Sequence, residues 1–247
     1  MAELLGTMFI VLFGTGVDVM YTLFNLGNYT NITLGWGLGV FLGILVSNRV
    51  SGAHLNPVVS LALVIIKRCP ATKLPHYVLG QMLGGFIGAA IVFFFYKAKF
   101  DLIDPGLTHT AGVFVTNPAV PFFLPAFLSE IIATAILLFG ILAIVEHFTV
   151  EKAGWLAPFA IAALIVGIGM SFGGMDGYAM NPARDLSPRL FTALIGFTDT
   201  GFGEGSKLWL APLVGPIVGG PLGAILYQFT LGKPPSIYKT DSQAYGK

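Results

Sequence analysis

Charged residues are scarce in this sequence. Only 10% of its 247 residues are Asp, Glu, Lys or Arg, against about 25% in an average soluble domain. The two signs nearly cancel, to a formal net charge of +1, so the chain lacks the clustered basic surface that binds nucleic acid. This composition excludes an ordinary soluble domain and argues against a nucleic-acid partner.

Cysteine is almost absent as well. Cys69 is the only one in the chain, so no disulfide can form within it and a cysteine-based metal site is not expected. Nothing else in the sequence points to a metal or to an organic cofactor.

Long apolar runs are what the sequence has in place of charge. It is 55% hydrophobic, and its mean hydropathy is +0.82. A helix needs roughly 20 apolar residues to cross a bilayer. Runs of this kind lie at about residues 2–24, 32–50, 74–96, 122–145, 155–172 and 208–231. We therefore predict an all-α membrane protein with six transmembrane helices in a lipid bilayer. Glu3 in place of a basic n-region, and the length of the first run, argue for a retained helix.

Lysine and arginine between the helices bear on orientation. With both termini inside, the inner group is Lys67, Arg68, Lys73, Lys152, Lys233, Lys239 and Lys247, and the outer group is Lys97, Lys99, Arg189 and Lys207. This modest bias predicts that both termini are cytoplasmic, and we expect the protein in the plasma membrane. Asn28 and Asn31 open formal glycosylation sequons in a predicted outer loop, which matter only in a eukaryotic host.

The second half of the chain repeats the first. Three landmarks recur 125, 127 and 131 residues apart, namely Asn56 and Asn181, Glu3 and Glu130, and Gly84 and Gly215. We predict one transmembrane domain over residues 1–247, with repeats at about 1–100 and 122–232 and a linker loop at about 97–121. Each repeat has three spans, an odd number, so the second copy must be inverted in the membrane.

Each Asn-Pro pair precedes an apolar stretch of about ten residues, at 58–66 and 183–194. Such stretches are too short to span and are typical of re-entrant segments. Asparagine is a good N-cap, and proline fits the first helical position. Asn56 with Pro57, and Asn181 with Pro182, therefore begin two half-helices. The inversion points their N-termini at each other near the bilayer centre.

The residues before each asparagine must be non-helical at membrane depth, which is tolerated only inside protein or beside a wet cavity. They are Gly52, Ala53, His54 and Leu55 in the first repeat, and Gly177, Tyr178, Ala179 and Met180 in the second. Their carbonyls would form two ladders of acceptors that lead to the asparagine amides, which describes a pore. We expect Glu3 and Glu130 to accept hydrogen bonds from these loops, and an interfacial position is the alternative for Glu3.

These residues resemble the major intrinsic proteins, the aquaporins and glycerol facilitators, over essentially the whole chain. The resemblance rests on the two Asn-Pro boxes, the Ala-Glu-x-x-Gly-Thr opening at residues 2–7, and the repeat. It implies six helices and two half-helices around a pore in each subunit of a homotetramer. The first box ends in Val58, where the family usually has the alanine that the second box has in Ala183.

The resemblance also implies a selectivity filter, formed by Trp36, Gly169, Tyr178 and Arg184. Glycerol facilitators carry Trp, Gly and an aromatic residue there and follow the arginine with Asp, as Asp185 does. A channel for glycerol, water and other small neutral solutes follows, with dihydroxyacetone, urea and protonated lactic acid as further candidates and ions and protons excluded. Tyr178 departs from the usual phenylalanine, and we hypothesise that its hydroxyl narrows the filter or contacts polar solutes.

Other interpretations stay open at this point. A secondary transporter also uses inverted repeats and broken helices, but it should keep a coupling carboxylate at the midplane, where the helices offer only Asp18 toward one end and the two repeat glutamates. An intramembrane enzyme would draw on His54 with Ser51 or Ser60, or on Asp176 with Ser171, without the motif context of a catalytic set. A structural junction protein and a pH gate at His54 are further alternatives.

Overall fold

The computed structural model describes residues 1–150, 154–202 and 207–232, and in this part of the chain all regular structure is helical. The helices are α1 (Ala2–Phe24), α2 (Tyr29–Ser51), α3 (Pro57–Ile65), α4 (Leu74–Phe95), α5 (Lys97–Ile103), α6 (Phe123–Val150), α7 (Ala157–Phe172), α8 (Pro182–Ile195) and α9 (Ala211–Thr230). Six of these segments are long and apolar enough to cross a membrane, which confirms the predicted spans. Lys152, Lys233, Lys239 and Lys247, used above for orientation, lie outside the described residues.

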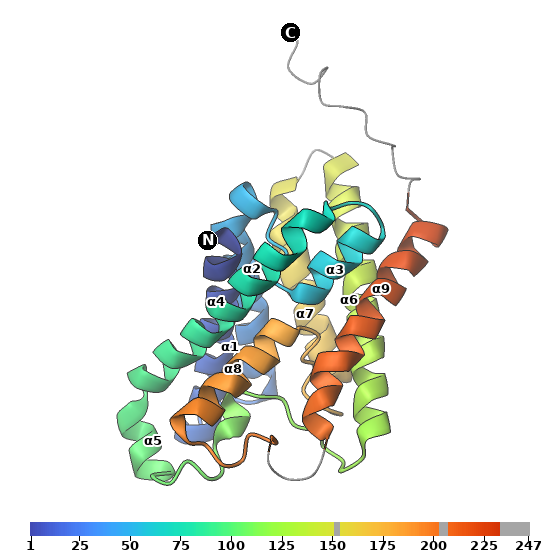
Figure 1. Cartoon of the computed structure of the whole chain (residues 1–247). Helices are drawn as coiled ribbons and strands as arrows, with labels where there is room; N and C mark the ends of the chain where they lie inside the picture. The colour runs from blue at the N-terminus through green and yellow to red at the C-terminus, as the bar shows by residue number, and fades with distance from the viewer. Residues whose placement is uncertain (151–153, 203–206, 233–247) are drawn as a thin grey trace.

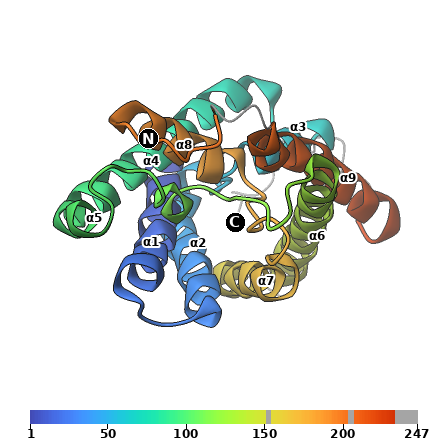
Figure 2. The ribbon, with the colours of Figure 1, turned by 90° about the horizontal axis from the view of Figure 1, so that it is seen from below.

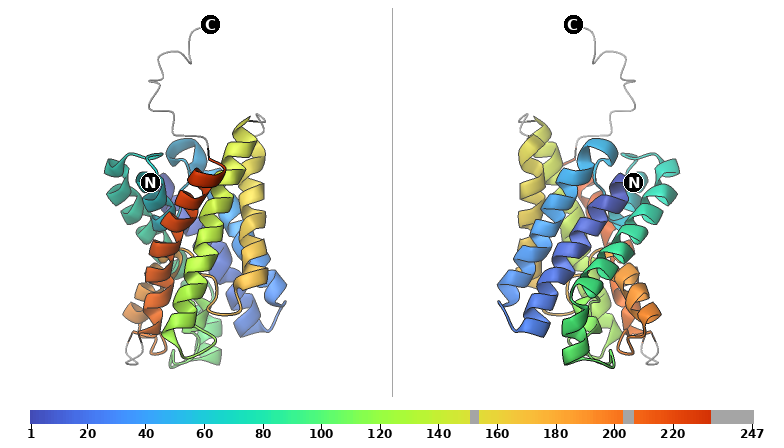
Figure 3. Two further views of the ribbon diagram at one scale, coloured as in Figure 1. Left: turned by 90° about the vertical axis from the view of Figure 1, so that its right-hand side faces the viewer. Right: turned by 90° about the vertical axis from the view of Figure 1, so that its left-hand side faces the viewer.

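The long helices pack in two groups with the same pattern of contacts. In one group α1 lies against α2 and α4, in the other α6 lies against α7 and α9, and α2 meets α7 between the groups. The N-terminus lies at one end of the bundle and α5 at the other (Figures 1 and 3). This shared pattern supports the inverted repeats that the sequence predicts.

The two short helices each pack against the other group. α3 contacts α9 as well as α4, and α8 contacts α4 as well as α9. Viewed along the bundle, the long helices form a ring, and α3 and α8 lie on the same side of it (Figure 2). Because each half-helix is held by helices from both halves, its N-terminus is fixed relative to the opposite half of the chain.

Glycine lets the helices of each group cross in close contact. A Cβ atom on Gly84 of α4 would collide with the backbone carbonyl of Leu4, and one on Gly219 of α9 would collide with that of Ile131. Leu4 and Ile131 each follow one of the two repeat glutamates, so both crossings lie beside a buried carboxylate. Small residues at such crossings are the usual device for close backbone approach between membrane helices.

The linker between the halves is more ordered than the predicted loop at 97–121. It opens with α5 and includes a short 3₁₀ turn at Ala111–Val113. Burial alone would raise the pKa of Asp104, but hydrogen bonds from the Thr108 and His109 amides and the Thr110 hydroxyl lower it to about 2. Asp104 ends α5, and its hydrogen bonds order the turn that follows. An aspartate followed by threonines was the sequence signal for this structure, and the prediction of a loop did not use it.

Asn28 and Asn31 have structural roles at the start of α2. Asn28 is the N-cap and accepts a hydrogen bond from the Asn31 backbone amide, while the Asn31 side chain accepts one from the Asn28 amide. This reciprocal pair is a capping box. Asn31 therefore lies in the first turn of α2. The prediction that it lies in an outer loop is wrong.

Candidate functional site

Both half-helices begin at their asparagine. The Asn56 side chain accepts a hydrogen bond from the Val58 amide at 2.8 Å, and the Asn181 side chain accepts from the amides of Ala183 and Arg184. Each satisfies backbone donors that have no partner within the helix. The proline after each asparagine sits at the first helical position, where its missing N–H costs nothing.

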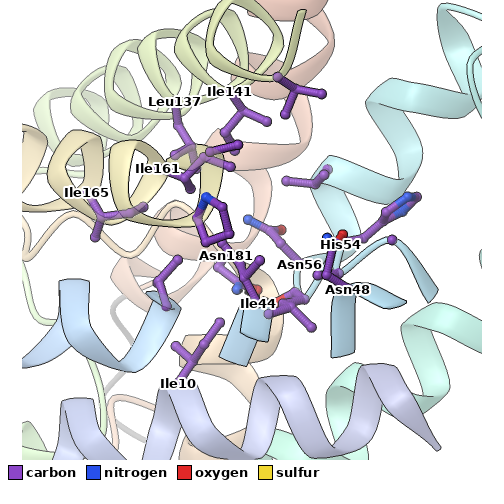
Figure 4. A pocket seen from close by; sticks show the side chains of 18 of the residues that line it. Ile10, Ile44, Asn48, His54, Asn56, Leu137, Ile141, Ile161, Ile165 and Asn181 are labelled. Carbon is purple, nitrogen blue, oxygen red and sulfur yellow. Dashed lines mark hydrogen bonds between the residues drawn. The ribbon is translucent and has the colours of Figure 1, made fainter. Parts of the chain in front are cut away.

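The two asparagine amides reach across to the opposite half of the chain. Asn56 Nδ2 donates to the Met180 carbonyl at 2.8 Å, and Asn181 Nδ2 donates to the Leu55 carbonyl at 2.8 Å. A primary amide has two N–H groups, so each asparagine keeps one donor beyond this bond. Both side chains line the same cavity, where Figure 4 shows them close together.

The loop before Asn56 turns its backbone donors toward Glu3. Ala53 and Leu55 have positive φ angles of 52° and 53°, a conformation that costs an L-residue roughly 1–2 kcal/mol. It brings the amides of His54 and Leu55 onto the Glu3 carboxylate, as alternating backbone conformations do around an anion. Because a trans peptide points its N–H and C=O in opposite directions, the Ala53 and His54 carbonyls face away from Glu3.

The second loop repeats this arrangement around Glu130. Tyr178 and Met180 have φ angles of 42° and 51°, and the amides of Ala179 and Met180 donate to the buried Glu130 carboxylate. By the same peptide geometry the Tyr178 and Ala179 carbonyls face away from it. The Leu55 and Met180 carbonyls, the last acceptors of the two predicted ladders, each accept one asparagine amide and keep a second lone pair.

Further side chains complete the Glu3 cluster. Ser51 and Gln81 donate to its carboxylate, and Glu3 is only 4% exposed, so it is a buried acceptor and not an interfacial residue. His54 contacts the Ser60 hydroxyl through Nδ1 at 3.0 Å. This contact links the His54 side chain to α3 and thereby fixes the loop before Asn56.

Valine in the first box is accommodated by a glycine opposite. Val58 is fully buried, and a Cβ atom on Gly220 of α9 would collide with its methyl group Cγ1. The departure from alanine at Val58 is thus matched by missing bulk on the neighbouring helix, and the capping geometry of Asn56 is kept.

Two cavities meet at three side chains. The larger, of about 510 Å³, contains Asn56 and Asn181, and the smaller, of about 290 Å³, lies on the side of the linker. Both are lined by Trp36, Tyr178 and Arg184. These three side chains form the boundary between the cavities.

The walls of the larger cavity differ in polarity. Apolar side chains from α6 and α7 lie across from Asn56, as Figure 4 shows; they are Leu137, Ile141, Ile161 and Ile165. The loop residues 52–55 and both asparagines form the polar side. A solute inside therefore meets hydrocarbon on one side and hydrogen-bonding groups on the other.

Arg184 lies at the boundary on the first turn of α8. It is 8% exposed, its guanidinium carbon is 3.7 Å from the centre of the Trp36 ring, and Nη1 has no hydrogen-bond partner among the described residues. The stacking is a cation–π contact. Arg184 therefore lines both cavities at their boundary.

The missing side chain of Gly169 leaves room for the ring of Tyr178. A Cβ atom at Gly169 would lie 2.8 Å from Cζ of the Tyr178 ring and 2.9 Å from the Thr33 methyl group. The space that we expected glycine to leave for a carbon chain is therefore filled by the tyrosine ring. The Tyr178 hydroxyl is buried and has no partner among the described residues.

Two buried residues of opposite charge, Asp185 and Arg189, hold the linker-side part of α8. Arg189 is 1% exposed and donates to the Asp185 carboxylate and to the carbonyls of Thr116 and Thr200. Asp185 also accepts from the amide and hydroxyl of Thr116. We had placed Arg189 among the outer-loop charges, but it is a buried anchor for the linker. The i, i+4 spacing of Asp185 and Arg189 was the available signal.

Comparison with known proteins places the chain in a family. The model of the major intrinsic protein family matches residues 1–227. Human aquaporin-9 is 39% identical, over 98% of this chain and 86% of its own length, and a probable glycerol uptake facilitator of Thermotoga maritima is 39% identical, over 93% and 97%. The crystal structure of the Plasmodium falciparum aquaglyceroporin superposes with a TM-score of 0.83 at 32% identity, covering 93% of this chain and 94% of that one. The chain is therefore a member of the major intrinsic protein family.

Proposed function

We propose that the protein is a passive channel for glycerol, water and other small neutral solutes. The observation that carries this proposal is the meeting of two cavities at Trp36, Tyr178 and Arg184, with the asparagine pair inside the larger one. The solute path would run from one cavity to the other across this boundary, which acts as the selectivity filter.

The filter suits a molecule with a carbon backbone and hydroxyl groups. The rings of Trp36 and Tyr178 offer apolar surface, while the Arg184 guanidinium and the loop carbonyls offer hydrogen bonds. A polyol uses both kinds of surface at once. Water needs only the hydrogen-bonding groups of the filter. It can therefore take the same path without depending on apolar contact with the aromatic rings.

Ions and protons are excluded by the central groups. Each half-helix carries roughly half a positive charge at its N-terminus, and Arg184 adds a full one, so a cation meets a positive potential in a narrow tube. The remaining N–H of Asn56 and that of Asn181 donate to a passing oxygen. That oxygen then cannot accept a proton from its neighbour in the file.

Carrier and enzyme functions have less support. None of the described residues that line the larger cavity is acidic, and Glu3 and Glu130 are engaged by the loop amides, so no carboxylate there is placed to couple an ion. The Ser60 hydroxyl bonds the Asn56 carbonyl and Gln81, which makes its contact with His54 part of the scaffold and not a nucleophile–base pair.

Stopped-flow light scattering on reconstituted vesicles tests the proposal. We expect glycerol and water fluxes well above those of protein-free vesicles, linear in concentration and without ion conductance. Saturating flux that needs an ion gradient would favour a secondary transporter. Homotetramer assembly, cytoplasmic termini and a plasma-membrane location belong to the same proposal and are tested by mass measurement in detergent and by labelling of terminal tags.

A further inference from the structure

Asp18 is a carboxylate at the outer side of the filter. It lies on α1 and lines the smaller cavity together with hydroxyl-bearing side chains such as Tyr21, Thr22 and Tyr29. Its Oδ2 atom accepts a hydrogen bond from Trp36 Nε1 at 3.2 Å. The carboxylate is thereby held at the edge of the ring that forms the boundary.

Two unsatisfied polar groups line the same cavity. Arg184 Nη1 and the Tyr178 hydroxyl have no hydrogen-bond partner among the described residues, and the two side chains are 8% and 5% exposed. Buried polar groups without a partner are costly.

Asp18 and Arg184 interact electrostatically without forming a direct ion pair. The positive charge of the Arg184 guanidinium acts on the Asp18 carboxylate. Among the ion pairs of the described residues, however, none joins Asp18 and Arg184 within 4.0 Å. The space beside them combines a fixed acceptor with a fixed donor.

We propose that Asp18 is a specificity-determining residue, the hydrogen-bond acceptor of an outer binding site for neutral solutes rich in O–H and N–H donors. The inference rests on the proposed channel function. It predicts that the channel favours polyols over carbonyl solutes of equal size in permeability. A hydroxyl can donate to Asp18, whereas a carbonyl oxygen placed there meets a like partial charge.

Glycerol and dihydroxyacetone form a matched pair of probes. They have the same carbon number, but glycerol has three hydroxyl donors and dihydroxyacetone has two and a carbonyl acceptor. Hydrogen bonds to a charged group contribute more than those to a neutral one. The ratio of the two permeabilities therefore reports on the acceptor at the outer mouth.

Asp18→Asn separates this role from a merely structural one. Asparagine has the same shape and keeps an oxygen for Trp36 Nε1, but it removes the charge and adds an N–H donor that suits a carbonyl. We expect the glycerol to dihydroxyacetone ratio of the full-length protein in vesicles to fall about fivefold. Asp18→Leu, which also breaks the bond to Trp36, should lower both solute fluxes.

Asp101→Asn is the control, because Asp101 is an exposed carboxylate of α5, away from both cavities, and its loss should leave the ratio unchanged. An unchanged ratio in Asp18→Asn, with a loss only in Asp18→Leu, would show that Asp18 merely holds Trp36 and would overturn the inference. If the unmodified protein passed neither solute, the proposed channel function itself would fail, and the inference with it.

Discussion

The two half-helices share a backbone design and differ in their side chains. α3 has the sequence PVVSLALVI and carries no charge, whereas α8 carries Arg184, Asp185 and Arg189, all buried. Both are capped by asparagine and followed by proline, and both asparagines donate to the opposite loop. The first half of the chain thus builds its part of the channel from apolar packing, and the second adds a buried ionic anchor.

This difference separates two tasks. The two asparagine caps and their crossing amides line the larger cavity, and the buried glutamates hold the loops beside it. Arg184 and Tyr178, which have no counterpart in the first half, also line the smaller cavity. The features that repeat in both halves would exclude ions and protons, and the features found in the second half alone would select the solute.

The largest expected effect is the loss of the anchor that only α8 has. Arg189→Leu leaves Asp185 buried without its cation, which costs about 3–5 kcal/mol in comparable cases. Thermal unfolding in detergent should show a strong loss of stability. Lys97→Ala, which breaks the exposed pair with Asp101, should cost at most about 1 kcal/mol. Similar unfolding temperatures for the two variants would contradict the anchoring role.

Removing each asparagine tests the symmetric part. Asn56→Ala and Asn181→Ala each lose an N-cap and one crossing hydrogen bond, so each should cost about 1–3 kcal/mol. The two losses should agree within about 1 kcal/mol, because each variant loses an asparagine cap and a crossing bond of 2.8 Å, and the second amide that Asn181 accepts lies farther away at 3.3 Å. Chemical unfolding in mild denaturant gives the comparison. A large loss in one variant alone would break the proposed equivalence.

Tyr178→Phe sharpens the asymmetric part with a single atom. The ring still packs beside Gly169, but the buried hydroxyl that has no partner among the described residues is gone. We expect the glycerol to water permeability ratio to change by about twofold to fivefold, the worth of one neutral hydrogen bond. Ratios of glycerol, water and lactic acid flux that all stay the same would show that the hydroxyl has no role in selection.

The smallest effect is expected in the linker that joins the halves. The folded pKa of Asp104 is lowered to about 2, so its contribution to stability is complete above its usual pKa and is lost as the pH falls through about 2. Asp104→Asn should cost less than about 1.5 kcal/mol and leave glycerol flux unchanged at pH 7. Hydrogen exchange of the 104–113 segment should rise in the variant. A pH-dependent loss between pH 7 and 5 at this segment would contradict the assignment.

The sequence predicted what periodicity and repetition encode. The six spans, the two half-helices and their asparagine caps follow from apolar length, from Asn-Pro chemistry and from the offset near 125 residues. The contacts of Glu3 and Glu130 with the loop amides were also expected, because a buried carboxylate needs donors and the loops had unpaired ones.

Contacts between distant side chains were beyond reach. The bond between Asp18 and Trp36, and the buried position of Arg189 against Thr116 and Thr200, depend on how separate helices and loops come together. The same holds for Gly169, whose missing side chain makes room for the Tyr178 ring and not for a solute. A glycine in the sequence indicates space, but only the fold shows what fills it.

Comparative flux across vesicles that contain the purified protein tests the central claim most directly. Stopped-flow measurement of glycerol and water, run with a voltage-clamp measurement of ion conductance on the same preparation, gives all three quantities. The account predicts fast, non-saturating passage of both solutes and no ionic current. Vesicles no more permeable to glycerol than bare lipid, or a protein-dependent ionic current, would contradict it.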